Sequence, residues 1–328
     1  PPSCATRERV RVMRVVVFLV VIVAATALGF IGISGYFLAH AAAGVLKVGS
    51  LAAALANAEP PTDPLALGYR GDPQAALSLP FQTVSLETPL GAAEAWLVPA
   101  TGVEAGRAIY VHGIAGARED GYRALSILHE AGWSVLLISY RNDAGAPASP
   151  DGAYGFGLTE WPDLEAAVAK MAPTDADPKL LVVAESMGGA ILGQFLAQSP
   201  LASRVQAVAL DSPAISFGAV IDHLATQGGK PLPGLTAWTA KQILRFKTPL
   251  PLTEADVTAA LTSFPGPMLL VQGSTDRIVP IGPSQALAVA RTAPTVTLWT
   301  GADHLGSYAE NPQAYKAAFQ DFLTRLSP

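Results

Sequence analysis

The sequence predicts an α/β protein: a doubly wound, mostly parallel sheet flanked by helices, with a small helical cap, preceded by one transmembrane helix. From residue 81 onward, short apolar runs rich in Val, Ile and Leu alternate with helix-like stretches. Such runs are typical of parallel strands buried on both faces, and the alternation is typical of a doubly wound sheet. Near the N-terminus, residues 15–46 contain no Asp, Glu, Lys or Arg, which indicates a membrane segment.

The densest part of this apolar segment, residues 15–38, would form a helix about 36 Å long. That length crosses a hydrocarbon core of about 30 Å. The positive-inside rule then predicts a basic cytoplasmic tail at 1–14, a single transmembrane anchor at 15–46 and a catalytic domain on the extracytoplasmic side of the cell membrane. The alternative is a signal peptide cleaved at a small-x-small site, at 39–41 or 56–58, which would release a secreted body. The basic residues before the segment are Arg7, Arg9, Arg11 and Arg14.

Five prolines within residues 47–80 predict a Pro/Ala-rich linker, because proline this dense interrupts helices and strands alike. A globular domain follows at 81–328. Its first two strands, at 81–87 and 93–98, are expected to form a hairpin. The further strands are predicted at 108–111, 134–140, 180–184, 205–210, 268–272 and 296–299.

Helices are expected between these strands. The stretch between the strands at 205–210 and 268–272 is far longer than one crossover helix needs. We therefore predict a small helical cap at about 214–263. The other predicted helices cover 121–131, 160–171, 187–198, 284–291 and 312–326.

The composition excludes several classes of protein. Hydrophobic residues make up 50% and charged residues 14% of the chain, which excludes intrinsic disorder. Cys4 is the one cysteine, so an internal disulfide and a thiolate metal cage are both excluded. Residues from 60 onward carry a net charge of −8, which argues against a nucleic-acid partner. We find no pattern with metal-ligand spacing and expect neither metal nor cofactor.

Residues 184–188, Ala-Glu-Ser-Met-Gly, join a predicted strand to a predicted helix. A nucleophile at such a sharp turn needs small residues two positions before and after it, as in the pattern G-x-S-x-G. Ala184 stands in the first small position and Gly188 in the second. Ser186 is therefore the predicted nucleophile, and the alternative is a serine that caps the following helix.

Ser186 needs a general base. His304 lies in a loop after the last strand, at the sheet edge where Ser186 is expected. Asp276 follows the preceding strand and is the predicted carboxylate that orients His304. Asp211 also ends a strand and is the rival acid. The chain order Ser, Asp, His is the order that this kind of sheet uses.

The loop after the strand at 108–111 is the fourth part of the predicted site. Gly113 in this loop lets the backbone approach the reacting atoms, so the N–H groups of Ile114 and Met187 are predicted to bind the oxyanion. His112 is expected to support the loop structurally. His129 and His223 lie inside predicted helices and are interpreted as surface or packing residues.

Together these motifs resemble the α/β-hydrolase superfamily over roughly residues 81–326. Within it, residues 155–163 and 185–189 resemble the small-lid bacterial serine-aminopeptidase-like esterases. The resemblance implies the chemistry of carboxylesterases, lipases, thioesterases and some peptidases.

The sequence thus predicts a serine hydrolase that cleaves a small-molecule ester or acyl substrate through an acyl-enzyme. A peptidase, thioesterase or acyltransferase with the same three residues is the alternative, and a non-catalytic binding module is a further one. A peptidase that trims amino termini would need acidic side chains near the pocket, and Asp143, Asp151 and Glu160 lie in suitable loops. Acyl chain length and oligomeric state stay open.

Overall fold

The computed structural model describes residues 4–50, 59–174, 180–230 and 232–326. Its centre is one eight-stranded sheet with the strand order β1-β2-β4-β3-β5-β6-β7-β8. The predicted fold class, a doubly wound and mostly parallel α/β sheet, is confirmed. The strands are β1 (Gln82–Thr88), β2 (Gly91–Val98), β3 (Gly106–Val111), β4 (Trp133–Ile138), β5 (Leu180–Glu185), β6 (Val205–Asp211), β7 (Met268–Gly273) and β8 (Thr295–Thr300).

The sheet is antiparallel at one edge and parallel in the rest. β1 and β2 form an antiparallel hairpin at one edge, and β2 also runs antiparallel to β4. From β4 through β3 to β8 all pairs are parallel. Every residue of β4, β5 and β7 is buried, which explains why these strands are continuous apolar runs in the sequence.

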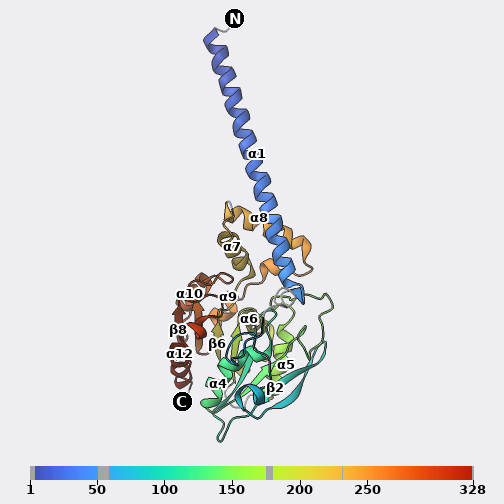
Figure 1. Cartoon of the computed structure of the whole chain (residues 1–328), viewed down its shortest axis with the longest axis vertical. Coiled ribbons are helices and arrows are strands. Elements are labelled where there is room, and N and C mark those ends of the chain that lie inside the picture. Colours follow the sequence, from blue (N-terminus) through green and yellow to red (C-terminus); the bar gives the residue numbers. More distant parts are fainter. Residues whose placement is uncertain (1–3, 51–58, 175–179, 231, 327–328) are drawn as a thin grey trace.

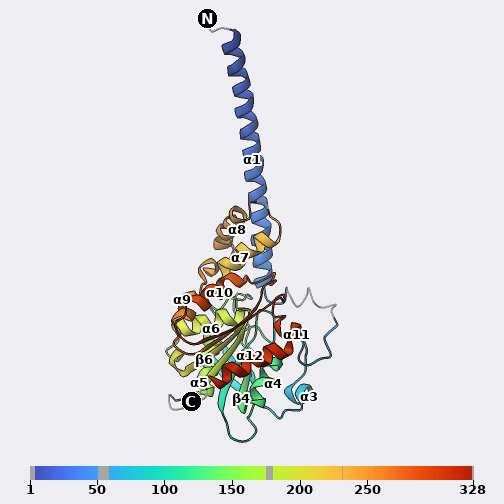
Figure 2. The same ribbon diagram turned by 90° about the vertical axis from the view of Figure 1, so that its left-hand side faces the viewer.

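Helices cover both faces of the sheet (Figures 1 and 2). Side chains of β5 alternate between two hydrophobic clusters, with Val182 facing one and Val183 the other. The first cluster includes α5 and α6, and the second includes α4 and α12. The helices of the body are α3 (Pro73–Leu77), α4 (Tyr122–Glu130), α5 (Trp161–Met171), α6 (Met187–Gln198), α10 (Ile281–Ala290), α11 (Ser307–Glu310) and α12 (Pro312–Thr324), with short 3₁₀ helices at Arg118–Gly121 and Ala202–Arg204. A third 3₁₀ helix, Leu252–Glu254, belongs to the segment between β6 and β7.

A helical cap is inserted between β6 and β7. It consists of α7 (Phe217–Gln227), α8 (Pro233–Lys247) and α9 (Thr258–Ser263). Pro233 opens α8, where its missing N–H costs no helical hydrogen bond. The cap lies at the end of the body from which the long N-terminal helix emerges (Figure 1).

That long helix, α1 (Cys4–Leu46), has two parts with different surroundings. Residues 8–30 are exposed, whereas the part from Ile31 to Leu46 packs on the cap and buries six side chains. A Cβ atom added to Gly35 would lie 2.7 Å from the Cβ of Thr239, so glycine lets α1 approach α8 this closely. The buried residues of this part include Ile31, Ser34, Leu38, Ala39, Ala42 and Leu46.

By length and composition, the stretch Glu8–Leu46 can cross a membrane, with a mean hydropathy of 2.9 in its most apolar window. Its C-terminal end is fixed to the body. The N–H of Tyr154 donates to the Leu46 carbonyl at 2.8 Å, and the N–H of Val48 donates to the Gly152 carbonyl at 3.0 Å. Two parts of the protein therefore hold the C-terminal part of this helix: the cap and the loop before α5.

The described part of the proline-rich segment lies on the body. The N–H of Gly68 donates to Asp120 at 3.0 Å, and Arg70 forms an ion pair with the same carboxylate at 3.2 Å. Residues 59–80 are therefore not free of the domain, contrary to what a linker implies. The possible cleavage site at 56–58 lies outside the described residues. The apolar residues that pack on the second cluster here are Leu65, Tyr69, Ala76, Leu77 and Leu79.

Deleting residues 1–48 should destabilise the protein far more than deleting residues 1–30. Only the longer deletion removes apolar side chains that are buried against the cap, and each large one contributes about 1.5–3 kcal/mol. We expect a lower unfolding temperature and self-association for the longer deletion, measured by circular dichroism and size-exclusion chromatography. Equal unfolding temperatures for the two truncated proteins would show that the cap does not depend on α1.

Candidate active site

Ser186 occupies a strained turn between β5 and α6. Its φ of 51° and ψ of −119° are rare for a residue other than glycine. A Cβ atom on Gly188 would overlap the carbonyl oxygen of Val111, and one on Gly113 would lie 2.9 Å from the Ser186 Cβ. Glycine at these two positions therefore lets the loop after β3 approach the serine. Ala184, in the first small position of the motif, is fully buried in β5.

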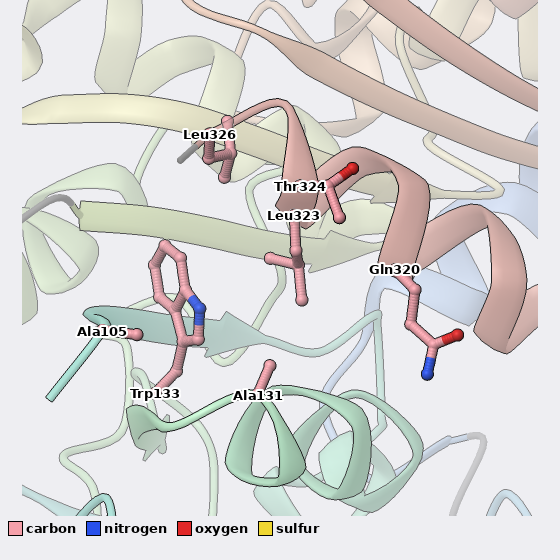
Figure 3. A pocket seen from close by; sticks show the side chains of 7 residues that line it. All are labelled: Ala105, Ala131, Trp133, Gln320, Leu323, Thr324 and Leu326. Carbon is pink, nitrogen blue, oxygen red and sulfur yellow. The ribbon is translucent and has the colours of Figure 1, made fainter. Parts of the chain in front are cut away.

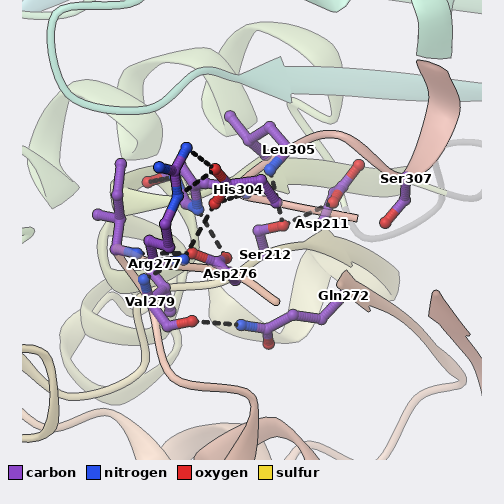
Figure 4. Close-up of polar contacts among 12 residues, drawn as sticks. Asp211, Ser212, Gln272, Asp276, Arg277, Val279, His304, Leu305 and Ser307 are labelled. Carbon is purple, nitrogen blue, oxygen red and sulfur yellow. Dashed lines mark hydrogen bonds and ion pairs between the residues drawn. The ribbon is translucent and has the colours of Figure 1, made fainter. Parts of the chain in front are cut away.

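Ser186, His304 and Asp276 form one hydrogen-bonded chain. The Nε2 atom of His304 lies 2.9 Å from the Oγ of Ser186, and its Nδ1 lies 2.8 Å from the Oδ2 of Asp276. A carboxylate only accepts hydrogen bonds, so Nδ1 carries the proton and Nε2 is free to accept from the serine hydroxyl. Figure 4 shows His304 beside Asp276.

The Asp276 carboxylate is fixed from its other side. It is buried, and its Oδ1 accepts from the N–H groups of Ile278 at 2.9 Å and Val279 at 2.8 Å. These donors hold the carboxylate in the orientation that His304 needs.

The other two acids near His304 have different partners. Asp211 accepts from the hydroxyls of Ser212 at 3.0 Å and Tyr315 at 3.1 Å, so the rival acid pairs with those residues. Asp303 forms an ion pair with Arg277, which lowers the pKa of that carboxyl. The structure thus brings Asp276 to the ring of His304.

The two predicted oxyanion donors lie on the segments that meet at Ser186. Met187 is the first residue of α6, directly after the serine. Ile114 follows Gly113 in the loop that packs on the serine. Backbone N–H groups at a helix start have no intrahelical acceptor and lie at the positive end of the helix dipole.

His112 supports this loop from behind. Its Nε2 lies 2.9 Å from Asp143, and its ring stacks on Tyr140 with 4.3 Å between the ring centroids. Burial lowers the pKa of His112, but the Asp143 carboxylate outweighs that effect and raises it. The hydroxyl of Tyr140 donates to the Gly113 carbonyl at 3.0 Å. His112 and Tyr140 therefore hold the glycine loop in place.

A buried polar network beneath the site was not predicted from the sequence. Arg123 of α4 donates to both oxygens of Glu185, at 2.7 and 2.8 Å, and Tyr110 donates to the same carboxylate at 2.8 Å. Arg123 also contacts the carbonyl of Leu305 at 3.3 Å. Glu185 precedes Ser186, and Leu305 follows His304, so the network connects two parts of the site. The sequence feature that could have indicated this network is Arg123, an arginine on the apolar face of a predicted helix.

The cap also contributes one contact to the site. The Nε2 of His223, on α7, lies 2.8 Å from the backbone carbonyl of Asp276. The sequence offered no signal for this contact, because His223 is separated from Asp276 by most of the cap.

Other places in the described part of the chain offer less chemistry. No group of three or more His, Cys, Asp or Glu side chains among the described residues is arranged to hold a metal ion. A pocket at the other edge of the sheet, where β4 begins at Trp133, contains no Ser, Cys, His, Asp or Glu in its lining (Figure 3). Its lining residues are Ala105, Ala131, Trp133, Gln320, Leu323, Thr324 and Leu326.

Comparison with known proteins gives consistent results. A family model described as the alpha/beta hydrolase fold matches residues 109–236. An esterase of Pyrococcus furiosus is 20% identical, with a TM-score of 0.60 over 81% of this chain and 97% of its own. An esterase from Exiguobacterium antarcticum is 13% identical, with a TM-score of 0.55 over 74% of this chain and all of its own. A thermophilic esterase from Thermogutta terrifontis is 18% identical, with a TM-score of 0.54 over 75% of this chain and all of its own. No curated protein matches the chain.

Glu185→Gln should change how stability depends on pH. Burial raises the pKa of Glu185 to about 7 from its usual 4.5, so the folded chain holds this proton more tightly than the unfolded chain. The resulting stability is fully present below the unfolded pKa and is lost as the pH rises through about 7. The unaltered protein should therefore lose more stability between about pH 5 and about pH 8 than the variant does.

Thermal unfolding in detergent at the two pH values measures this difference. Glu87→Gln, on exposed β1, is the control and should keep the pH dependence of the unaltered protein. If Glu185→Gln and the control respond to pH alike, Glu185 does not titrate in this range.

Proposed function

We propose that this chain, which has the α/β-hydrolase fold, is a membrane-anchored serine hydrolase that cleaves carboxylic esters. The hydrogen-bonded chain from Ser186 through His304 to Asp276 carries this proposal. It pairs a nucleophile with a base, and the base with an orienting acid, which is the arrangement that acyl transfer needs.

The reaction follows from these contacts. As the Ser186 Oγ attacks the acyl carbonyl carbon, His304 Nε2 takes the hydroxyl proton, and a tetrahedral intermediate forms. His304 then gives this proton to the departing alkoxide, which leaves an acyl-enzyme. Water attacks the acyl-enzyme with His304 again as base, and the acid and free Ser186 are released. Asp276 stays ionised throughout and stabilises the imidazolium.

The backbone N–H groups of Ile114 and Met187 are the proposed oxyanion donors. Their stabilisation acts on the charge that develops on the carbonyl oxygen, so it lowers the barrier more than it strengthens substrate binding. The start of α6 adds the positive end of a helix dipole at the same place.

An ester fits the site better than the amino terminus of a peptide. Asp143 already pairs with His112, and Glu160 is buried and accepts from the N–H groups of Gly155 at 2.6 Å and Gly157 at 2.9 Å. Both acids hold the protein's own loops together. Asp151, the third acid considered for binding an ammonium group, is exposed.

The anchor is the exposed apolar part of α1, with its N-terminus in the cytoplasm and the catalytic domain outside. Retention of this helix is supported by its packing. Cleavage at residues 39–41 would remove Leu38 and Ala39 from the hydrophobic cluster that they share with the cap.

Ser186→Ala should abolish ester hydrolysis without unfolding the protein. Loss of the nucleophile from an intact set of three residues costs about 10⁶-fold in kcat. The measurement is hydrolysis of p-nitrophenyl esters of graded acyl length, with amide and thioester analogues beside them. The same proteins are treated with a fluorophosphonate probe, which reacts only with an activated serine.

Ser85→Ala, on exposed β1, is the matched control and should keep both hydrolysis and labelling. Labelling that persists in Ser186→Ala would assign the nucleophile to another serine. Failure of the unaltered protein to hydrolyse any ester or bind the probe would favour a non-catalytic role.

Asp276→Asn should lower kcat by about 10⁴-fold, because the amide favours the wrong tautomer of the His304 ring. Asp211→Asn should have a much smaller effect on kcat, because its carboxylate pairs with Ser212 and Tyr315. Steady-state kinetics on one ester give the ranking, and unfolding temperatures separate it from loss of fold. The opposite ranking would place the functional acid at the end of β6.

A further inference from the structure

Helix α8 has an exposed apolar face that no described part of the body covers. Leu232, Leu235 and Trp238 leave 58%, 51% and 58% of their surface exposed. Leu235 and Trp238 are three residues apart in the first turns of α8, so they lie on the same side of the helix, and Leu232 directly precedes the helix. We call these three residues the α8 face.

The charges of α8 differ from those of the rest of the domain. The helix contains Lys241, Arg245 and Lys247 and no acidic residue, whereas residues from 60 onward are net acidic. A helix with Trp and Leu on one side and Lys or Arg elsewhere is typical of helices that lie in the membrane interface. Tryptophan in particular is enriched at the level of the lipid headgroups.

The position of α8 relative to α1 fits the same interpretation. A hydrocarbon core of about 30 Å takes up about 20 helical residues, so a core that begins at Val15, after the four arginines, extends along α1 to about residue 34. It ends just before Gly35, where α1 touches Thr239 of α8. Both views show α7 and α8 at the end of the body from which α1 emerges (Figures 1 and 2). A bilayer around α1 would therefore reach the α8 face.

A basic side chain also lies where this arrangement predicts the lipid headgroups. The Nζ of Lys247 lies 2.8 Å from the Nδ1 of His40, on the side of Gly35 that is nearer to the body. A charged ammonium there is placed to face lipid headgroups and water, because the hydrocarbon core excludes it.

We propose that the α8 face is a second membrane contact, which lies in the interface of the same bilayer that α1 spans. This inference rests on the proposed anchor and hydrolase. The cap then stands between the bilayer and Ser186, and His223 of the same cap contacts Asp276. The substrate class that suits this placement is an amphiphilic ester whose acyl chain dissolves in the leaflet.

A fluorescent probe tests the contact without any need for activity. The full chain with Cys4→Ser carries a nitrobenzoxadiazole label at Leu235→Cys or at Val103→Cys and is placed in phosphatidylcholine/phosphatidylglycerol vesicles. Val103 is a matched control, because it is an apolar residue, 93% exposed, in the turn before β3. We expect blue-shifted emission and quenching by a doxyl-labelled lipid at position 235, and neither at position 103.

A kinetic comparison tests the substrate class. The double variant Leu235→Ser with Trp238→Ser should lower kcat/KM about tenfold for a long-chain ester dissolved in the vesicles, which corresponds to about 1.4 kcal/mol. Its kcat/KM for water-soluble p-nitrophenyl acetate should stay at the level of Val103→Ser. An equal loss on both esters, in protein that keeps the unfolding temperature of Val103→Ser, would overturn the proposed substrate class.

The outcomes separate this proposal from the one on which it rests. If the protein stays with the vesicles but the label at position 235 shows neither blue-shifted emission nor quenching, the membrane contact is overturned. The proposed anchor and hydrolase are then unaffected. Protein that does not remain with the vesicles overturns the anchor. Probe burial that appears without lipid and grows with protein concentration assigns the α8 face to a second copy of the chain, which also overturns the proposal.

Discussion

The buried ion pair between Arg123 and Glu185 is the interaction on which the geometry of the site depends. Two charges removed from water are tolerated only when their hydrogen bonds are nearly all made, and removing one partner from such a pair costs about 3–5 kcal/mol. Here Tyr110 donates a further hydrogen bond to the Glu185 carboxylate, and Arg123 also contacts the carbonyl of Leu305. The end of β5, the helix α4 and the histidine loop are thereby held in one arrangement, with Ser186 and His304 as its neighbours in the chain.

Much of this arrangement was predictable because the sheet is buried. Strands enclosed on both faces must be apolar throughout, so β3 to β7 were visible as runs, and the polar residues just beyond their carboxyl ends had to meet at one edge. The choice between Asp211 and Asp276 was not settled in this way. Both end neighbouring strands, and the difference lies in the turn after β7, where two backbone N–H groups orient Asp276 toward the ring of His304.

Contacts between elements far apart in the chain could not be predicted. An apolar helix without charged residues gives no periodic signal for a buried side, so the sequence did not reveal that residues 31–46 of α1 pack on α8. The contact between His223 and Asp276 depends on how the cap folds back over the sheet. Residues 59–80 were predicted to be a linker because proline prevents regular structure. Proline does not prevent packing, however, and Leu65, Tyr69, Leu77 and Leu79 pack on the body.

The attachment of Leu46 and Val48 to the loop at residues 152–154 limits how far the domain can move relative to α1. A catalytic domain on a loose tether samples a hemisphere around its attachment point and meets molecules from the surrounding solution. A domain joined to its helix by backbone hydrogen bonds and by the packing of the cap cannot swing in this way. In a bilayer, such a domain would keep one height and one tilt, and it would meet its partners by lateral diffusion in two dimensions.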